Sequence, residues 1–382
     1  MNECITALEY EHGIVAIDSG QVRPQMAACY LLETDTAVAV VETGNNHSTG
    51  RILSVLANRG RQPEEVSHVI VTHVHLDHAG GTGSLMQELP NATLVVHPRG
   101  ARHMVDPSRL EASARAVYGD EEYEKQHGVL IGVPEERVRI MEDGGELQIG
   151  ARTLRFMDTP GHARHHFCVW DETSRGWFSG DTFGISYREL DTQAGPFIFP
   201  TTTPIQFDPP ALIDSVGRLM EREPENIYLT HFGRVRDLRR LADDLVAGVR
   251  QFARWGEEFR EHPDRSERIR STMMTWLVDG ARQHGVTLPV QGSVSHHDET
   301  SPGPGKSVQA IGVGRLAQPL QPGDSLEMRF RSLYTTRGFV ESNDNAEVVF
   351  NGTFFWNSYF PSIGYSRSNE LSDDEDRKDN DL

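Results

Sequence analysis

Three imidazoles and one carboxylate stand within six consecutive residues, 73–78, whose sequence is HVHLDH. The apolar, β-branched residues just before this segment predict a buried strand that ends here. Alternate residues of an extended segment project to one side, so His73 and His75 can bind one metal ion. Asp77 and His78, in the turn that follows, can face a second ion. The segment therefore predicts a layered α/β fold with a metal site at the end of a strand.

Three further residues of ligand type follow predicted strands. His162 ends the sequence TPGH, Asp181 ends SGD and His231 ends LTH. Each of these alone is a weak signal, because single His and Asp residues are common on protein surfaces. Together with residues 73–78 they supply the imidazole and carboxylate ligands that a two-metal site requires.

The segments THVHLDH, TPGH, SGD and LTH occur in the order and at the approximate separations of the metallo-β-lactamase superfamily. Over roughly residues 10 to 290 the chain resembles the glyoxalase-II-like and lactonase-like branches of that superfamily. The resemblance implies that one metal is bound by His73, His75 and His162, the other by Asp77, His78 and His231, with Asp181 bridging the two.

The resemblance also implies a mechanism. Two divalent cations would share a water, lower its pKa and present a bridging hydroxide to the carbonyl of an ester, thioester or lactone. Asp77 could take or relay the proton, and Asp181 would hold both cations. Zn²⁺ suits the ligand set best, and Mn²⁺ and Fe²⁺ remain open. The expected partner is a small-molecule substrate.

Residues near these segments could shape the substrate site. His165 and His166 follow His162, and His166 could orient a ligand or face the substrate as a donor. Tyr187 could hold the carbonyl, as lactonase-like relatives do, or be an ordinary packed aromatic. Arg188 could bind a substrate carboxylate or an acidic neighbour. Residues 197–204 could form the wall for an acyl or aromatic group, or a strand edge.

The pattern of elements predicts an αββα four-layer sandwich. Strand signals recur along the chain, and helices are expected at 48–59, 111–126 and 209–221. A long helical pair, 235–262 and 266–284, is expected as a C-terminal extension. Residues 1–292 are therefore predicted to form the hydrolase domain.

Beyond residue 292 the composition changes. Residues 293–307 are predicted to be a Ser/Gly/Pro linker, 308–365 a small β-rich segment, and 366–382 an acidic, disordered tail. The β-rich segment resembles part of the N-terminal domain of M1-aminopeptidase-like proteins fused to ABC-transporter permeases. The chain contains no HExxH motif, so the resemblance does not imply peptidase activity.

Composition narrows the classes of function. A net charge of −19 disfavours a nucleic-acid groove, which relies on clustered Lys and Arg. The absence of an apolar run of membrane length and of a basic-then-apolar start predicts a cytoplasmic protein without a membrane span. The oligomeric state stays open. A β-lactamase, a nuclease of the same fold and a non-catalytic metal-binding protein remain as alternatives.

Overall fold

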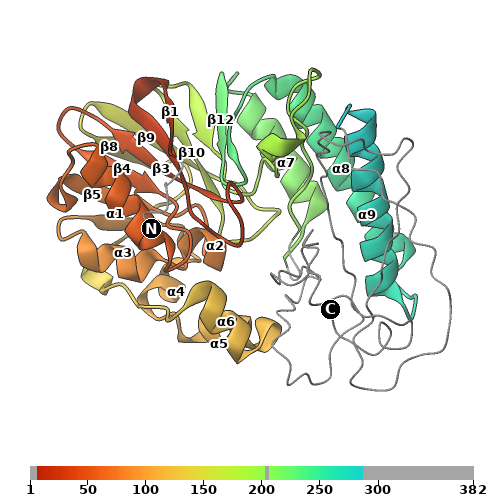
Figure 1. The fold of residues 1–382 in the computed structure, drawn as a ribbon, viewed down its shortest axis with the longest axis horizontal. Helices are drawn as coiled ribbons and strands as arrows, with labels where there is room; N and C mark the ends of the chain where they lie inside the picture. Colours follow the sequence, from red (N-terminus) through yellow and green to blue (C-terminus); the bar gives the residue numbers. More distant parts are fainter. Residues whose placement is uncertain (1–6, 203–205, 287–382) are drawn as a thin grey trace, which may run out of the picture. The chain divides into compact units, whose positions relative to one another are not determined.

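The computed structural model describes residues 7–202 and 206–286, which belong to a unit spanning Met1–Leu288. In this unit two β-sheets lie face to face, and helices cover the outer side of each sheet (Figure 1). The predicted boundary at 292, the linker 293–307, the β-rich segment 308–365 and the tail 366–382 lie outside the described residues.

The first sheet runs in chain order from β1 to β7. Its strands are β1 (Ala7–Tyr10), β2 (Ile14–Asp18), β3 (Ala28–Glu33), β4 (Val38–Val41), β5 (Val66–Ile70), β6 (Thr93–Val96) and β7 (Val138–Ile140). Pairing is antiparallel up to β4 and parallel from β4 to β7. Parallel neighbours end at the same edge of a sheet, so the residues that follow β4 and β5 meet there.

The second sheet has the order β13-β12-β11-β10-β9-β8. Its strands are β8 (Glu146–Ile149), β9 (Arg152–Asp158), β10 (Phe167–Asp171), β11 (Gly176–Phe178), β12 (Asn226–Leu229) and β13 (Gly233–Val235). The pair β11–β12 is parallel, and α7 (Pro209–Met220) makes the crossover between them. The residues that follow β11 and β12 therefore emerge at one edge.

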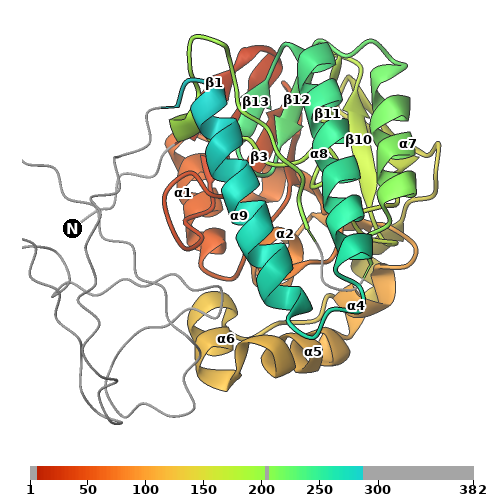
Figure 2. The ribbon, with the colours of Figure 1, turned by 90° about the vertical axis from the view of Figure 1, so that its right-hand side faces the viewer.

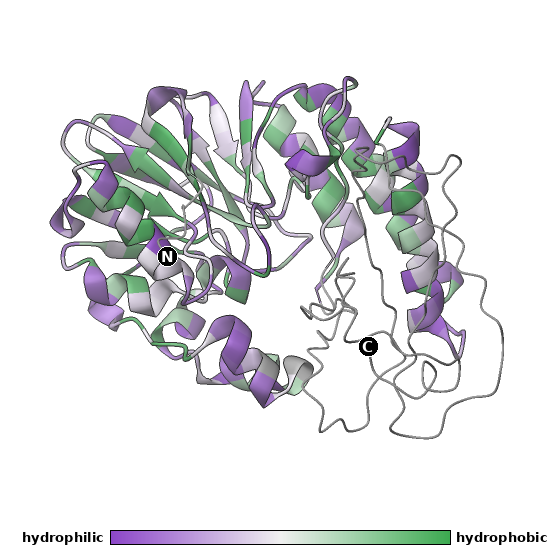
Figure 3. Ribbon diagram, viewed as in Figure 1, coloured by the Kyte–Doolittle hydropathy of each residue, from purple (hydrophilic) through white to green (hydrophobic). Residues whose placement is uncertain are grey.

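Three apolar clusters separate four layers, which confirms the predicted αββα sandwich. Hydrophobic residues gather on the strands and on the inner faces of the helices (Figure 3). The first cluster packs α1 (Ser48–Asn58) and α3 (Thr82–Glu88) on the first sheet, and includes Ile52, Leu85 and Val69. The second lies between the sheets and includes Tyr30, Ile70, Phe156 and Phe178. The third packs α7 and α8 (Leu238–Glu258) on the second sheet, and includes Leu212, Leu241 and Trp177.

The described residues form further α-helices. They are α2 (Leu76–Ala79), α4 (Ala101–Val105), α5 (Ser108–Tyr118), α6 (Asp120–His127) and α9 (Arg265–Gln283). The single helix predicted at 111–126 is wrong, because Gly119, with φ +78°, separates α5 from α6. The helix predicted to begin at Val235 begins at Leu238, because Val235 pairs in β13.

The C-terminal helical pair is present as expected. Figures 1 and 2 show α9 along the outer side of α8. Trp276 of α9 packs against Phe252 and Trp255 of α8, with ring centroids 5.5 and 6.2 Å away. Across the described residues, none of the helices combines the length and the apolar character that crossing a membrane would take.

Candidate metal centre

Three of the predicted ligands form one cluster just beyond β5 and β9. His73 Nε2 lies 2.9 Å from His75 Nδ1, and His162 Nε2 lies 3.0 Å from that same His75 nitrogen. His73 and His162 are buried, while His75 is half-buried and opens the cluster to one side. Three imidazole nitrogens therefore converge on one point, which is the arrangement that a metal ion requires.

Three other predicted ligands form a second cluster. Asp77 and His78 lie in α2, which begins at Leu76, inside the HVHLDH segment. Asp77 Oδ2 lies 3.6 Å from His78 Nε2 and 3.4 Å from His231 Nε2. The turn of α2 thus brings both side chains toward His231, while the His78 ring also lies against the His73 ring, with centroids 4.0 Å apart.

Asp181 lies between the two clusters. Its Oδ2 atom is 3.3 Å from His162 Nε2, whereas its Oδ1 atom is 3.2 Å from His78 Nε2 and 3.4 Å from His231 Nε2. The residue before it, Gly180, has φ +48°, and a Cβ there would come within 2.5 Å of His166 Nε2. Glycine is therefore required for the sharp turn that brings Asp181 back over the site.

Two atoms of the site have no hydrogen-bond partner in the described part of the chain. They are His78 Nε2 and Asp181 Oδ1, which are both buried and lie 3.2 Å apart without the geometry of a hydrogen bond. A buried polar atom without a partner costs about 1–3 kcal/mol, so such atoms in a folded protein call for an explanation. A divalent cation that accepts lone pairs from an imidazole and a carboxylate would satisfy both. The residues present therefore fit a pair of metal ions.

Hydrogen bonds on the outer side of four rings fix their orientation. In each ring Nδ1 bonds to an oxygen acceptor, which leaves Nε2 facing the centre. The pairs are His73 with Thr72 Oγ1 at 3.1 Å, His78 with Glu42 Oε1 at 3.0 Å, His162 with Thr201 Oγ1 at 3.0 Å, and His231 with the Met26 carbonyl at 2.9 Å. The Nε2 atoms of these four candidate ligands are therefore oriented toward the centre without any ion.

Glu42 is a site residue that sequence reasoning missed. It follows β4, is only 1% exposed and has φ 64°. Its carboxylate accepts hydrogen bonds from the Thr72 backbone N–H at 3.2 Å, from His78 Nδ1 at 3.0 Å, and from Thr230 Oγ1 at 3.3 Å. It also accepts one from the Thr72 hydroxyl. The available signal was a carboxylate directly after a buried strand parallel to β5.

Replacing Glu42 with glutamine should weaken the second cluster. The amide keeps the size of the side chain but removes the charge that holds the His78 ring, so we expect metal affinity at that cluster to fall about 10–100-fold. Competition titration with a chromophoric chelator measures this. Glu65→Gln, the same change at a residue paired with Arg61 on the surface, serves as the control. Equal affinities in wild type and Glu42→Gln would exclude this role.

The histidines of the two clusters differ in protonation when no metal is bound. Burial lowers the pKa of His73 well below its usual value, and lowers that of His162 to about 4. Burial also lowers the pKa of His78, but the Asp77 and Asp181 carboxylates outweigh it and raise the value to about 10. The pKa of His231 is likewise raised against its burial, by Asp181 above all. At neutral pH the first cluster is therefore neutral and the second holds two imidazolium groups.

The residues predicted to meet the substrate fall in different environments. His166 is fully buried, and its Nε2 accepts the Asp181 backbone N–H at 3.2 Å. This position suits the orienting role and leaves no surface for a substrate. Tyr187 is half-buried at the rim, and the Arg23 guanidinium stacks 4.3 Å from its ring centroid. Arg188 pairs with an acidic neighbour, Asp191, at 3.2 Å.

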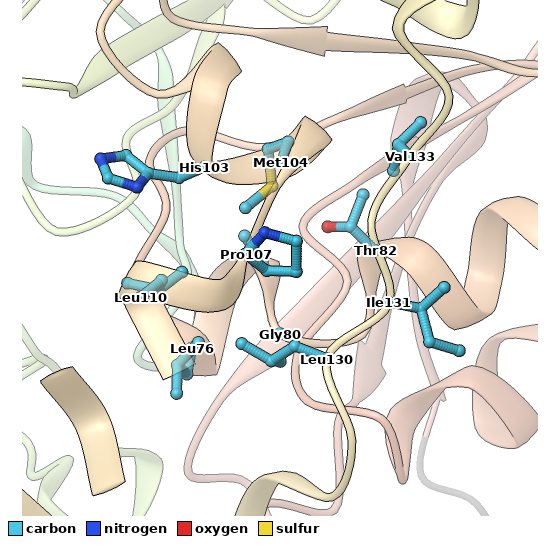
Figure 4. Close-up of a pocket in the computed structure, with 11 residues that line it drawn as sticks. Leu76, Gly80, Thr82, His103, Met104, Pro107, Leu110, Leu130, Ile131 and Val133 are labelled. Atoms are coloured by element: carbon cyan, nitrogen blue, oxygen red, sulfur yellow. The ribbon is translucent and has the colours of Figure 1, made fainter. Parts of the chain in front are cut away.

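The opposite side of α2 is a packing surface. Leu76 and Gly80 face Met104, Pro107 and Ile131 there, in a pocket drawn in Figure 4. The space left between them is about 10 Å³, which is about one water molecule. No substrate fits in it, so the open side of the ligand set lies elsewhere.

A comparison with known families covers the whole of this site. The family model described as the metallo-beta-lactamase superfamily matches residues 22–231, which is more than half of the chain and includes every ligand candidate. The chain belongs to the metallo-β-lactamase superfamily. Its enzyme class is accordingly that of a metal-dependent hydrolase.

Individual relatives of the superfamily are distant. A metallo-beta-lactamase fold-containing protein of Sulfurisphaera tokodaii is 25% identical over 58% of this chain and 79% of its own length. An N-acyl homoserine lactonase of Bacillus thuringiensis is 26% identical over 57% of this chain and 84% of its own. The crystal structure of an archaeal superfamily protein from Sulfolobus tokodaii superposes with a TM-score of 0.52 at 24% identity, covering 63% of this chain and 86% of that one. The last comparison shows the shared fold.

Proposed function

We propose that this chain is a dinuclear metal-dependent hydrolase that cleaves an ester, thioester or lactone. One ion would be held by His73, His75 and His162, the other by Asp77, His78 and His231, with Asp181 between them. The observation that carries the proposal is the position of Asp181, whose two oxygens each lie within 3.4 Å of a different cluster. The N-acyl homoserine lactonase relative supports a carbonyl substrate.

The metals, when bound, would activate a water and polarise the substrate carbonyl. The chain's own residues position and move protons around that reaction. Asp77 has a side chain that is 28% exposed, whereas Asp181 is 7% exposed, so Asp77 is the carboxylate that solvent and substrate can reach. Although burial opposes it, His78 and His231 lower the pKa of Asp77, which keeps this carboxylate ionised. It is therefore available as an anionic ligand, and because its basicity is low it could only relay a proton to a more basic group, such as the leaving group of the substrate.

The donor set supports some metals over others. Imidazole nitrogens outnumber carboxylates in the combined clusters, which favours Zn²⁺, with Mn²⁺ or Fe²⁺ as the other candidates. Tyr187 lies at the rim of the centre, where a phenol could donate to the substrate carbonyl. Arg188 is half-buried and already paired with Asp191, so its contribution to the substrate site would be to hold this loop.

A substrate panel tests the proposal. The full chain, loaded with Zn²⁺ or Mn²⁺, is assayed against acyl esters, thioesters, lactones, a phosphodiester and a chromogenic β-lactam. We expect turnover of at least one acyl ester, thioester or lactone, lost on treatment with a chelator and restored by the metal. Turnover that survives complete metal removal, or turnover of the phosphodiester or β-lactam alone, would contradict it.

A further inference from the structure

A short two-stranded ribbon connects the metal centre with the surface. The backbone N–H of Ile185 donates to the Phe199 carbonyl at 2.8 Å, and the N–H of Phe199 donates to the Ile185 carbonyl at 3.0 Å. Side chains alternate between the two faces of such a ribbon. Ser186 and Ile198 are buried on one face. The other face is half-buried and entirely apolar or aromatic: Ile185, Tyr187, Phe197 and Phe199.

The rings on the half-buried face form a continuous row. Tyr187 and Phe199 have centroids 6.1 Å apart, Phe199 and Phe197 are also 6.1 Å apart, and Phe197 and His284 are 5.4 Å apart. We call these four residues the ring row. Helix α9 supports its outer end, because a Cβ on Gly280 would lie 3.3 Å from the Phe197 ring. A side chain at that position would displace the ring by a few tenths of an ångström.

Hydrogen bonds tie the inner end of the ring row to the metal ligands. The Ser186 N–H donates to the His231 carbonyl at 2.6 Å. Thr201, two residues after Phe199, accepts from His162 Nδ1 at 3.0 Å and donates to the Asp181 carbonyl at 3.1 Å. A chain segment spans at most about 3.6 Å per residue, so Phe197 lies within about 14 Å of Thr201 along the chain. The row therefore starts at the ligands and leads outward.

We propose that the ring row binds the acyl group of the substrate, and that this hydrolase prefers apolar acyl chains of medium length, or aryl groups, over acetyl. This inference rests on the proposed function and names its substrate class. A half-exposed apolar face that adjoins a catalytic centre is the form that an acyl subsite takes. The carbonyl would lie at the metals, and the chain of the acyl group would lie along Phe199 and Phe197.

A series of p-nitrophenyl esters, from acetate to octanoate, tests this with the metal-loaded full chain. Complete burial of a methylene group is equivalent to about fourfold in affinity, so we expect kcat/KM to rise about two- to fourfold per added methylene in the wild type. In Phe199→Ala and Phe197→Ala, kcat/KM should fall below the wild-type value by a factor that grows with the length of the acyl chain. The change should appear in KM more than in kcat. Phe199→Leu, which preserves bulk, should be intermediate and guards against a folding defect.

A control and a second readout separate the possible failures. Met274→Ala removes a side chain that is 57% exposed on α9 and should keep the wild-type series. Octanoate binding to the metal-free protein, measured by calorimetry, should exceed acetate binding and should weaken at least fivefold in Phe199→Ala. If no ester is cleaved but octanoate binds this way, the proposed function fails and the subsite stands. Equal kcat/KM for all chain lengths, or octanoate binding that Phe199→Ala leaves unchanged, would overturn the subsite.

Discussion

Asp181→Asn is expected to lower kcat by about 10² or more and to reduce the metal content toward one ion per chain. The asparagine side chain has the same shape, but it presents one neutral oxygen and one N–H₂ group. Asp181 directs one oxygen to His162 and the other to His78 and His231, so the amide can serve only one of the two clusters. Steady-state kinetics and elemental analysis of the same sample measure both effects.

Asp244→Asn is the matched control for this substitution. Asp244 pairs with Arg240 on the surface of α8 and is 52% exposed, so its loss should change stability slightly and leave metal content and kcat alone. A normal kcat in Asp181→Asn, with two ions retained, would show that Asp181 does not join the clusters.

Loading the metal-free chain with Zn²⁺ at pH 7 is expected to release about two protons per chain. Nearly all of them should be released when an ion binds the second cluster, which contains His78 and His231. His78, whose pKa is raised to about 10, and His231, whose pKa is raised well above its usual value, carry protons that the metal must displace. His73 and His162 have lowered pKa values and are already neutral. Calorimetry in two buffers of different protonation enthalpy gives the number of protons for each binding step.

The direction of the pH dependence follows from the same groups. In the metal-free chain, raised histidine pKa values contribute stability that is complete below the unfolded value near 6.5, and that is lost as the pH rises through about 10 for His78. Metal competes with these protons, so affinity at the second cluster should increase with pH, by up to about 100-fold per unit. His68→Gln, outside the site, should leave proton release unchanged. If no protons are released, or if both ions release equal numbers, His78 and His231 are not the protonated histidines of the metal-free site.

The ligand candidates could be found from sequence because their signals are local. Each lies two to eight residues after the end of a strand, and the alternation of an extended chain decides which side His73 and His75 face. The layered fold could be predicted for the same reason, because apolar strands and amphipathic helices are read over short windows. The break at Gly119 was missed because a glycine inside a helical pattern is often tolerated.

What could not be predicted depends on contacts between distant residues. Glu42 lies 30 and 36 residues from its partners Thr72 and His78, and only the parallel pairing of β4 with β5 brings them together. From the sequence, Arg188 could bind a substrate carboxylate or an acidic neighbour. The fold of its loop places it 3.2 Å from Asp191. His166 similarly needed the Gly180 turn, which directs the Asp181 N–H at its ring.

The centre draws its side chains from both sheets of the sandwich. His73 and His75 follow β5 of the first sheet, whereas Asp181 and His231 follow β11 and β12 of the second. If these side chains hold the two ions as proposed, separation of the sheets would release them. At 100 times its Kd, an ion that binds only the closed state would add about 2.7 kcal/mol to the free energy of unfolding. Packing between the sheets would thus influence metal affinity at a distance. Weakening a contact between the sheets, such as that of Tyr30 with Phe178, would therefore lower the affinity for the ions although neither residue is a candidate ligand.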